Sequence, residues 1–156
     1  MSESVSEMTN IPDVVSDGHL SVLEYLRNVK EIKEELCLVE DKRVLLRDMI
    51  SHLSKYPPKE EGTKEDYDYL TSRLKIADKR LVEVFNKYLE KEEEADRFLK
   101  CISKNQIGKA VLYRRYIMGE PWKMVSLQME RSIRGLEALG KQAICELEEL
   151  VKGASS

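Results

Sequence analysis

Residues 22–56 read VLEYLRNVKEIKEELCLVEDKRVLLRDMISHLSKY, and this stretch decides the fold of the chain. Its apolar residues recur with the heptad spacing of a coiled coil. The a positions are Val22, Val29, Leu36, Arg43 and Ile50, and the d positions are Tyr25, Ile32, Val39, Leu46 and Leu53. Lys, Glu and Arg crowd the outer positions. We therefore predict one long amphipathic helix, which should end near Tyr56 because the following Pro57-Pro58 pair cannot continue it.

A second heptad follows a loop predicted at residues 57–63 (PPKEEGT), in which Thr63 is a suitable helix N-cap. Its a positions are Tyr67, Leu74, Leu81, Tyr88, Ala95 and Ile102, and its d positions are Leu70, Ala77, Val84, Lys91 and Phe98. Neither helix can bury its apolar stripe alone. The short loop favours an antiparallel helical hairpin within one chain, and the competing arrangement is pairing between two chains in a dimer. Heptad periodicity does not separate these two arrangements.

The last third of the chain predicts a compact set of shorter helices. Gly119 is a suitable C-cap, Pro121 suits the first turn of the next helix, and Ser132 is a suitable N-cap for the final one. A turn at residues 129–132 separates these last two helices. The expected fold class is all-α: a long antiparallel helical hairpin at 19–102, followed by a C-terminal helix-turn-helix domain at 103–152.

The N-terminal segment, residues 1–18, predicts a mostly disordered tail, because Ser, Glu, Asp, Asn, Pro and Gly dominate its composition. Ser16 or Asp17 is the expected cap of the first long helix. The first ten residues contain acid and no Lys or Arg, which does not fit a secretory signal peptide. We expect a cytoplasmic protein.

Composition excludes several other classes. The 156 residues are 35% charged and 42% apolar, and the longest apolar runs are too short to span a membrane. Three widely spaced cysteines and two isolated histidines do not make a disulfide framework or a zinc site. The phosphate-binding, dinucleotide-binding, esterase and metalloprotease motifs are also missing from the sequence. We expect no cofactor, no metal, no membrane contact and no enzymatic activity.

The charge distribution points to a nucleic-acid partner. Residues 104–145 contain eight Lys or Arg and three Glu, although the whole chain has a net charge of −3. In a helix-turn-helix, the second helix enters the major groove of DNA with its N-terminal residues against base edges. The residues that this geometry presents to double-stranded DNA are Arg131, Ser132, Arg134, Glu137 and Lys141. Lys123, Arg114 and Arg115, together with Arg131, are placed for phosphates. From spacing alone, an ordinary three-helix bundle with a solvated basic face explains the pattern equally well.

The stretch from Leu112 to Leu147, LYRRYIMGEPWKMVSLQMERSIRGLEALGKQAICEL, resembles region 4 of sigma-70-type factors. It is more closely similar to the sigma-like regulators of Gram-positive phages and prophages, of the RinA/ArpU type. The motifs that carry the likeness are Arg115-Tyr116-Ile117, Gly119, Pro121-Trp122, Arg131-Ser132-Ile133-Arg134 and Ala143-Ile144-Cys145-Glu146-Leu147. The chain departs from that family's pattern at Ser126, where an Ala is usual, and at Ile133, which replaces an Arg.

The resemblance implies a transcriptional regulator of phage or prophage type that binds DNA near promoters, with RNA polymerase as a further expected partner. A homodimer through the helical arm is left open by the heptads. Two alternatives also stand beside this interpretation. The first is a DNA-packaging component, since small terminase subunits also join a helix-turn-helix to helical oligomerisation segments. The second is a coiled-coil protein-interaction module with a diverged helix-turn-helix.

Overall fold

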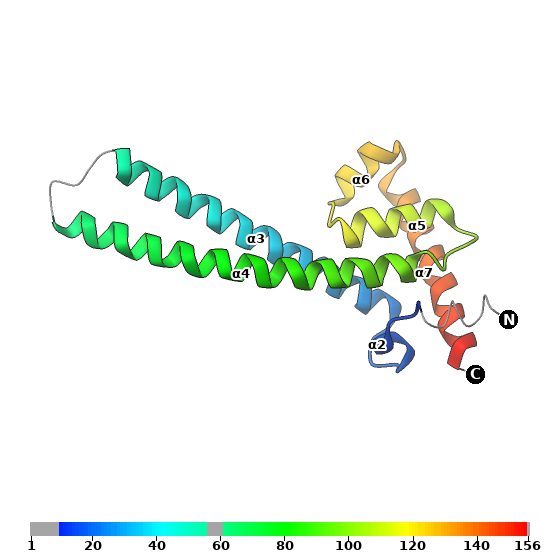
Figure 1. Cartoon of the computed structure of the whole chain (residues 1–156). Helices are drawn as coiled ribbons and strands as arrows, with labels where there is room; N and C mark the ends of the chain where they lie inside the picture. Colours follow the sequence, from blue (N-terminus) through cyan, green and yellow to red (C-terminus); the bar gives the residue numbers. More distant parts are fainter. Residues whose placement is uncertain (1–9, 56–60, 156) are drawn as a thin grey trace. The chain divides into compact units, whose positions relative to one another are not determined.

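The computed structural model describes residues 10–55 and 61–155, and all regular secondary structure in these ranges is helical (Figure 1). The elements are α2 (Asp13–Ser16), α3 (Val22–Lys55), α4 (Glu61–Leu99), α5 (Gln106–Leu112), η1 (Tyr113–Ile117), α6 (Trp122–Met129) and α7 (Ile133–Ser155). The predicted all-α fold class is confirmed. Within the described ranges, none of the helices has the length and apolarity needed to cross a membrane.

The two long helices lie side by side and run antiparallel (Figure 1). Tyr25 near the start of α3 bonds Glu94 near the end of α4, whereas Arg43 further along α3 bonds the earlier residue Asp78. The pairing is therefore within one chain, as the hairpin prediction states. α3 ends at Lys55, as Pro57 requires; the predicted loop residues 57–60 lie outside the described residues. α4 begins at Glu61, so the prediction of Thr63 as its N-cap is wrong.

The chain divides into two compact units, and the boundary is not at residue 102. We call residues 34–88 the hairpin unit, and residues 10–33 with 89–155 the core unit. The start of α3, residues 22–33, and the end of α4, residues 89–99, thus belong to the same unit as α5, α6 and α7. The sequence-based division placed the boundary at residue 102, where the second heptad repeat ends. The structure instead divides the chain where contacts between residues are few.

In the hairpin unit, every buried apolar side chain that the structure describes lies at a predicted heptad position: Leu36, Leu46, Ala77, Val84 and Tyr88 all occupy predicted a or d positions. The one polar a position is explained by an ion pair, since the Nε of Arg43 donates to Asp78. A second ion pair across the seam joins Arg80 to Glu35. Tyr67, a predicted a position, is 39% exposed and does not belong to this core.

The segment before α3 differs from the predicted disordered tail in its described part. Ile11 and Val15 are buried, and the short helix α2 packs against α7. The prediction of Ser16 or Asp17 as the cap of α3 is wrong, because Ser21 caps it. The Ser21 hydroxyl accepts a bond from the Glu24 amide, and the Glu24 carboxylate accepts one from the Ser21 amide. This reciprocal pair is a capping box. Residues 1–9 of the predicted tail lie outside the described residues.

The largest apolar cluster of the core unit joins α3 and α4 to α7. Tyr25 packs edge-on against Phe98, with ring centroids 5.9 Å apart, and its hydroxyl donates to Glu94 at 2.7 Å. Burial, reinforced by this carboxylate, raises the pKa of Tyr25. Lys91 occupies the polar d position of the second heptad. Its Nζ lies 3.3 Å from Oε1 of Glu94 and 5.9 Å from the Tyr25 ring centroid. The lysine charge is therefore held at the edge of the cluster by a carboxylate and an aromatic face.

Candidate nucleic-acid interface

Two short-range contacts fix the turn between α6 and α7. The Ser126 hydroxyl donates to the Arg131 carbonyl at 2.6 Å, and the Arg131 amide donates back to the Ser126 carbonyl at 3.3 Å. Between them, Glu130 adopts the left-handed conformation, with φ of 52°. The two helices are thus joined by residues 130–132, in agreement with the predicted turn. Ser126, at a position where the resembled family has Ala, therefore bonds across this turn.

The start of α7 is capped as the sequence predicts. The Ser132 hydroxyl accepts a bond from the Gly135 amide at 3.2 Å. Leu136, Ala143 and Leu147 of α7 are fully buried, and Leu136 packs with Val111 and Val125. Because these buried residues share one helix face, the opposite face of α7 is left to solvent. The exposed residues of that face include Arg134, Glu137, Ala138, Lys141 and Gln142.

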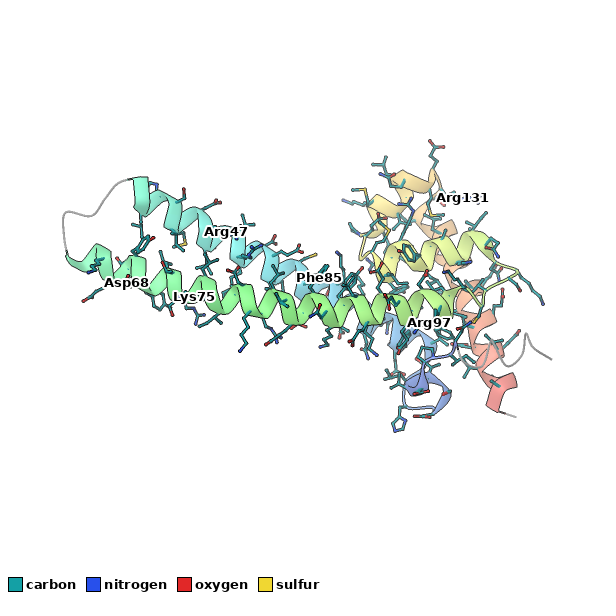
Figure 2. The ribbon with its side chains drawn as sticks, in the orientation of Figure 1. Arg47, Asp68, Lys75, Phe85, Arg97 and Arg131 are labelled. Carbon is teal, nitrogen blue, oxygen red and sulfur yellow. The ribbon has the colours of Figure 1, made fainter. Side chains whose placement is uncertain are left out.

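The predicted base-contacting residues all lie at the surface of this unit. Arg131, Ser132, Arg134, Glu137 and Lys141 are exposed, and so is Lys123 at the start of α6. Figure 2 shows Arg131 at the turn that follows α6. Within residues 10–55 and 61–155, the four cations at positions 123, 131, 134 and 141 have no ion-pair partner. Their charges are not neutralised inside the domain.

The other two predicted phosphate-binding residues are engaged within the domain. Arg114 approaches both carboxylate oxygens of Glu120 at 3.4 Å. Arg115 donates to the Glu120 carbonyl at 3.1 Å, and its guanidinium lies 5.2 Å from the Trp122 ring centroid. Both arginines belong to the π-helical turn η1 and are half-buried. They fasten η1 to the start of α6, so they present less charge to solvent than the residues of α7.

Glycines set how closely α5 approaches α7. A Cβ on Gly108 would lie 2.4 Å from the Leu139 carbonyl oxygen and 2.9 Å from the Ala143 Cβ, so only glycine fits at this crossing. Gly140 is also buried, but a Cβ there would make ordinary contacts of 3.5 Å with Val111 and 3.7 Å with Leu112. The turn before α6 contains Gly119 with φ of 71°, which matches its predicted role as a C-cap.

Sequence reasoning missed the residue that anchors the loop between α4 and α5. The Glu146 carboxylate accepts bonds from the backbone amides of Ser103, Lys104 and Asn105, and from the Asn105 side chain at 2.9 Å. Burial acts to raise the pKa of Glu146, but these donors outweigh it and hold the pKa below its ordinary value. No local pattern links a carboxylate on α7 to a loop some forty residues earlier.

No family model, curated protein or solved structure matches this chain. Two features of the chain bear on its function: the exposed cations around the turn between α6 and α7, and the resemblance of residues 112–147.

Proposed function

We propose that this chain is a DNA-binding transcriptional regulator, in which α6 and α7 form a helix-turn-helix and the N-terminal half of α7 reads the major groove of double-stranded DNA. The phage or prophage type, and contact with RNA polymerase, follow from the resemblance of residues 112–147 alone. No catalytic step is part of this proposal.

One observation carries it: four cations without internal partners gather on the turn and on the outward face of the two helices. An unpaired cation beside a phosphate releases counterions on binding, which is the main source of affinity for DNA. Arg134, in the first turn of α7, has the fork of donors that matches the two acceptors of guanine. Arg131 lies in the turn just before α7 and Lys123 in the first turn of α6, where a docked helix-turn-helix meets the phosphate backbone. The bonds of Ser126 and Ser132 fix the backbone of the turn that joins the two helices.

Selection of bound fragments from a genomic or random library identifies the preferred site, and fluorescence anisotropy then measures its affinity. Binding should weaken with salt, with a slope of log K against log salt of about −3, since four free cations are offered and one of them is assigned to a base. Arg134→Ala should weaken binding by about 1–3 kcal/mol and relax preference at one base pair.

The decisive variant is Arg134→Glu/Lys141→Glu. It should abolish binding while the melting temperature stays nearly unchanged, because both residues are exposed and unpaired. The matched control is Arg47→Glu/Lys75→Glu, which makes the same charge change on exposed residues of the hairpin unit (Figure 2). It should retain binding.

An equal loss of DNA affinity in both variants would mean that binding depends only on the net charge of the chain, and would contradict base readout by α7. Full binding by the Arg134→Glu/Lys141→Glu variant would contradict it outright. In that case the coiled-coil interaction module is the better interpretation. Preference of the chain for packaging-site DNA over promoter DNA in the selection would favour the terminase-like alternative.

A further inference from the structure

One side of the hairpin unit exposes a row of large apolar residues. Leu38, Leu45 and Met49 of α3 are 70%, 59% and 43% exposed, and Tyr69 and Ile76 of α4 are 63% and 57% exposed. In the heptads, Met49 is at position g and the other four are at c. Positions g of an antiparallel pair lie on one side of the seam, and the Glu35–Arg80 pair, both at g, marks that side. We call these five residues the c/g face.

The register of the hairpin brings four of the five residues of this face to matching levels. Because Arg43 of α3 bonds Asp78 of α4, the residue two further along α3 is level with the residue two earlier on α4. Leu45 is therefore level with Ile76. Met49 and Tyr69 lie within one helical turn of the same level by the same count. Apolar side chains thus stand opposite each other in two successive layers, on a surface that nothing in residues 34–88 covers.

The hairpin unit also has little core of its own. Of its described side chains, only Leu36, Leu46, Ala77, Val84 and Tyr88 are buried apolar residues. A two-helix layer of this kind gains stability mainly when a further layer covers it. Contiguous exposed apolar residues at heptad positions are typical of a helix that docks against other helices.

The charges of the two helices indicate what covers the face. Residues 34–53 of α3 contain five acidic and three basic side chains, and residues 73–88 of α4 contain two acidic and five basic ones. Over these two stretches, which carry four of the five residues of the c/g face, α3 is net acidic and α4 is net basic. A second copy turned about a two-fold axis parallel to the helices would place its basic helix over the acidic one, and its acidic helix over the basic one. The other two-fold arrangement would stack like charges, which is unfavourable.

We propose that a second copy of this chain covers the c/g face, so that two hairpin units form a four-helix arrangement with α3 of each against α4 of the other. A two-fold axis parallel to the helices preserves the level of every residue. Leu45 therefore meets the partner's Ile76, and Met49 meets the partner's Tyr69, twice in the symmetric interface. This dimer is distinct from pairing of the heptad seam between chains, because each seam stays closed within its own chain. It does not depend on DNA binding by the core unit.

Sedimentation equilibrium of the full chain tests the face. At about 100 μM the chain should be a dimer, since an association with a micromolar dissociation constant is then nearly complete. Leu45→Asp/Ile76→Asp should raise the dissociation constant at least about tenfold, because each dimer would desolvate four carboxylates. The matched control, Val44→Asp/Val82→Asp, changes residues that are 58% and 60% exposed on the opposite side of the seam, and should leave the dimer intact.

A charge exchange tests the arrangement. Asp41→Lys/Asp48→Lys makes α3 basic, and Lys79→Glu/Lys87→Glu makes α4 acidic. Each variant alone should dimerise more weakly, whereas an equal mixture should recover the wild-type association as a heterodimer.

A wild-type chain that is monomeric at about 100 μM overturns the proposal, whether or not it binds DNA. Equal disruption by the Val44→Asp/Val82→Asp control overturns the choice of face, and failure of the mixture to recover overturns the arrangement. Circular dichroism of each variant checks that the helices remain formed, since a dimer lost through unfolding would be visible as lost helicity. If an Asp pair does unfold the chain, Leu45→Ser/Ile76→Ser removes the same apolar contacts without adding charge, and should still yield a folded monomer.

Discussion

The hairpin unit and the core unit share the two long helices α3 and α4, yet they pack in different ways. The hairpin unit, residues 34–88, buries five apolar side chains and exposes nine large ones among its described residues. The core unit buries seventeen and exposes five. In the first, two helices meet along a single seam. In the second, the ends of α3 and α4 are covered by α2, η1 and α7 as well.

The difference shows what a heptad can and cannot specify. A heptad repeat specifies how one helix packs against one partner helix. It does not specify what packs against the opposite face of either helix. In the core unit that second face is filled by shorter helices whose approach is set by single residues, such as Gly108 at a crossing and Glu146 at a loop. Stability in the core unit should therefore respond sharply to individual substitutions, and in the hairpin unit only weakly.

The largest effect should come from removing a fully buried leucine from the core unit. Leu136→Ala should destabilise that unit by about 3 kcal/mol, because the cavity lies among side chains that are themselves enclosed. Leu46→Ala, the same change in the hairpin unit, should cost about 1–2 kcal/mol, because Leu46 retains some exposure and solvent can reach the gap. Urea denaturation followed by Trp122 fluorescence, which reports on the core unit, and by circular dichroism measures both. Equal losses would contradict the comparison.

Gly108→Ala should cost about 2 kcal/mol or more, because the new Cβ would collide with the backbone oxygen of Leu139, which cannot rotate away. Gly140→Ala is the matched control on α7, the helix against which α5 packs. Its Cβ would make ordinary contacts, and the gain in helix propensity should stabilise the chain by up to about 1 kcal/mol. Thermal melts of the two variants should shift in opposite directions. A neutral Gly108→Ala would mean that α5 and α7 are free to separate.

Much of the fold could be predicted from sequence because it depends on periodicity and on local chemistry. The seam residues, the end of α3 before Pro57, the turn after α6 and the Ser132 cap all follow from neighbours within a few positions. The capping box of Ser21 and Glu24 was equally local and was overlooked in favour of Ser16 and Asp17. Burial of Ile11 and Val15 could not be predicted, because their partner α7 lies more than a hundred residues away.

For the candidate site, sequence predicted which side chains of α7 face solvent, since that follows from helical spacing. It did not predict that Arg114 and Arg115 would be held by Glu120 and Trp122. The sequence alone does not show which carboxylate, carbonyl or aromatic ring a given Lys or Arg side chain contacts in the folded chain. The four cations without partners could be separated from these two only by their contacts.

Glu146 offers a pH-dependent test of the core unit. Its pKa is lowered in the folded chain, so its contribution to stability is present above the ordinary carboxyl value of 4.5 and is lost as the pH falls through the folded value. Glu146→Gln should cost about 1 kcal/mol at neutral pH, since an amide cannot accept all the bonds that the carboxylate accepts. The cost should shrink in acid. Melts of wild type and variant from pH 7 downward measure it, and Glu149→Gln, an exposed change on the same helix, should show no such convergence.

The smallest effect should be a gain at the turn between α6 and α7. Glu130 is the one non-glycine residue with positive φ among the described residues, and its left-handed conformation costs a side chain about 1 kcal/mol that glycine does not lose. Glu130→Gly should therefore stabilise the core unit by about 0.5 kcal/mol, once the greater freedom of glycine in the unfolded chain is subtracted. Glu137→Gly, the same change within α7, should destabilise it by up to about 1 kcal/mol. Opposite signs in parallel urea titrations would support the conformational explanation. If both variants lose stability, the Glu130 side chain stabilises the turn by more free energy than its left-handed backbone conformation costs.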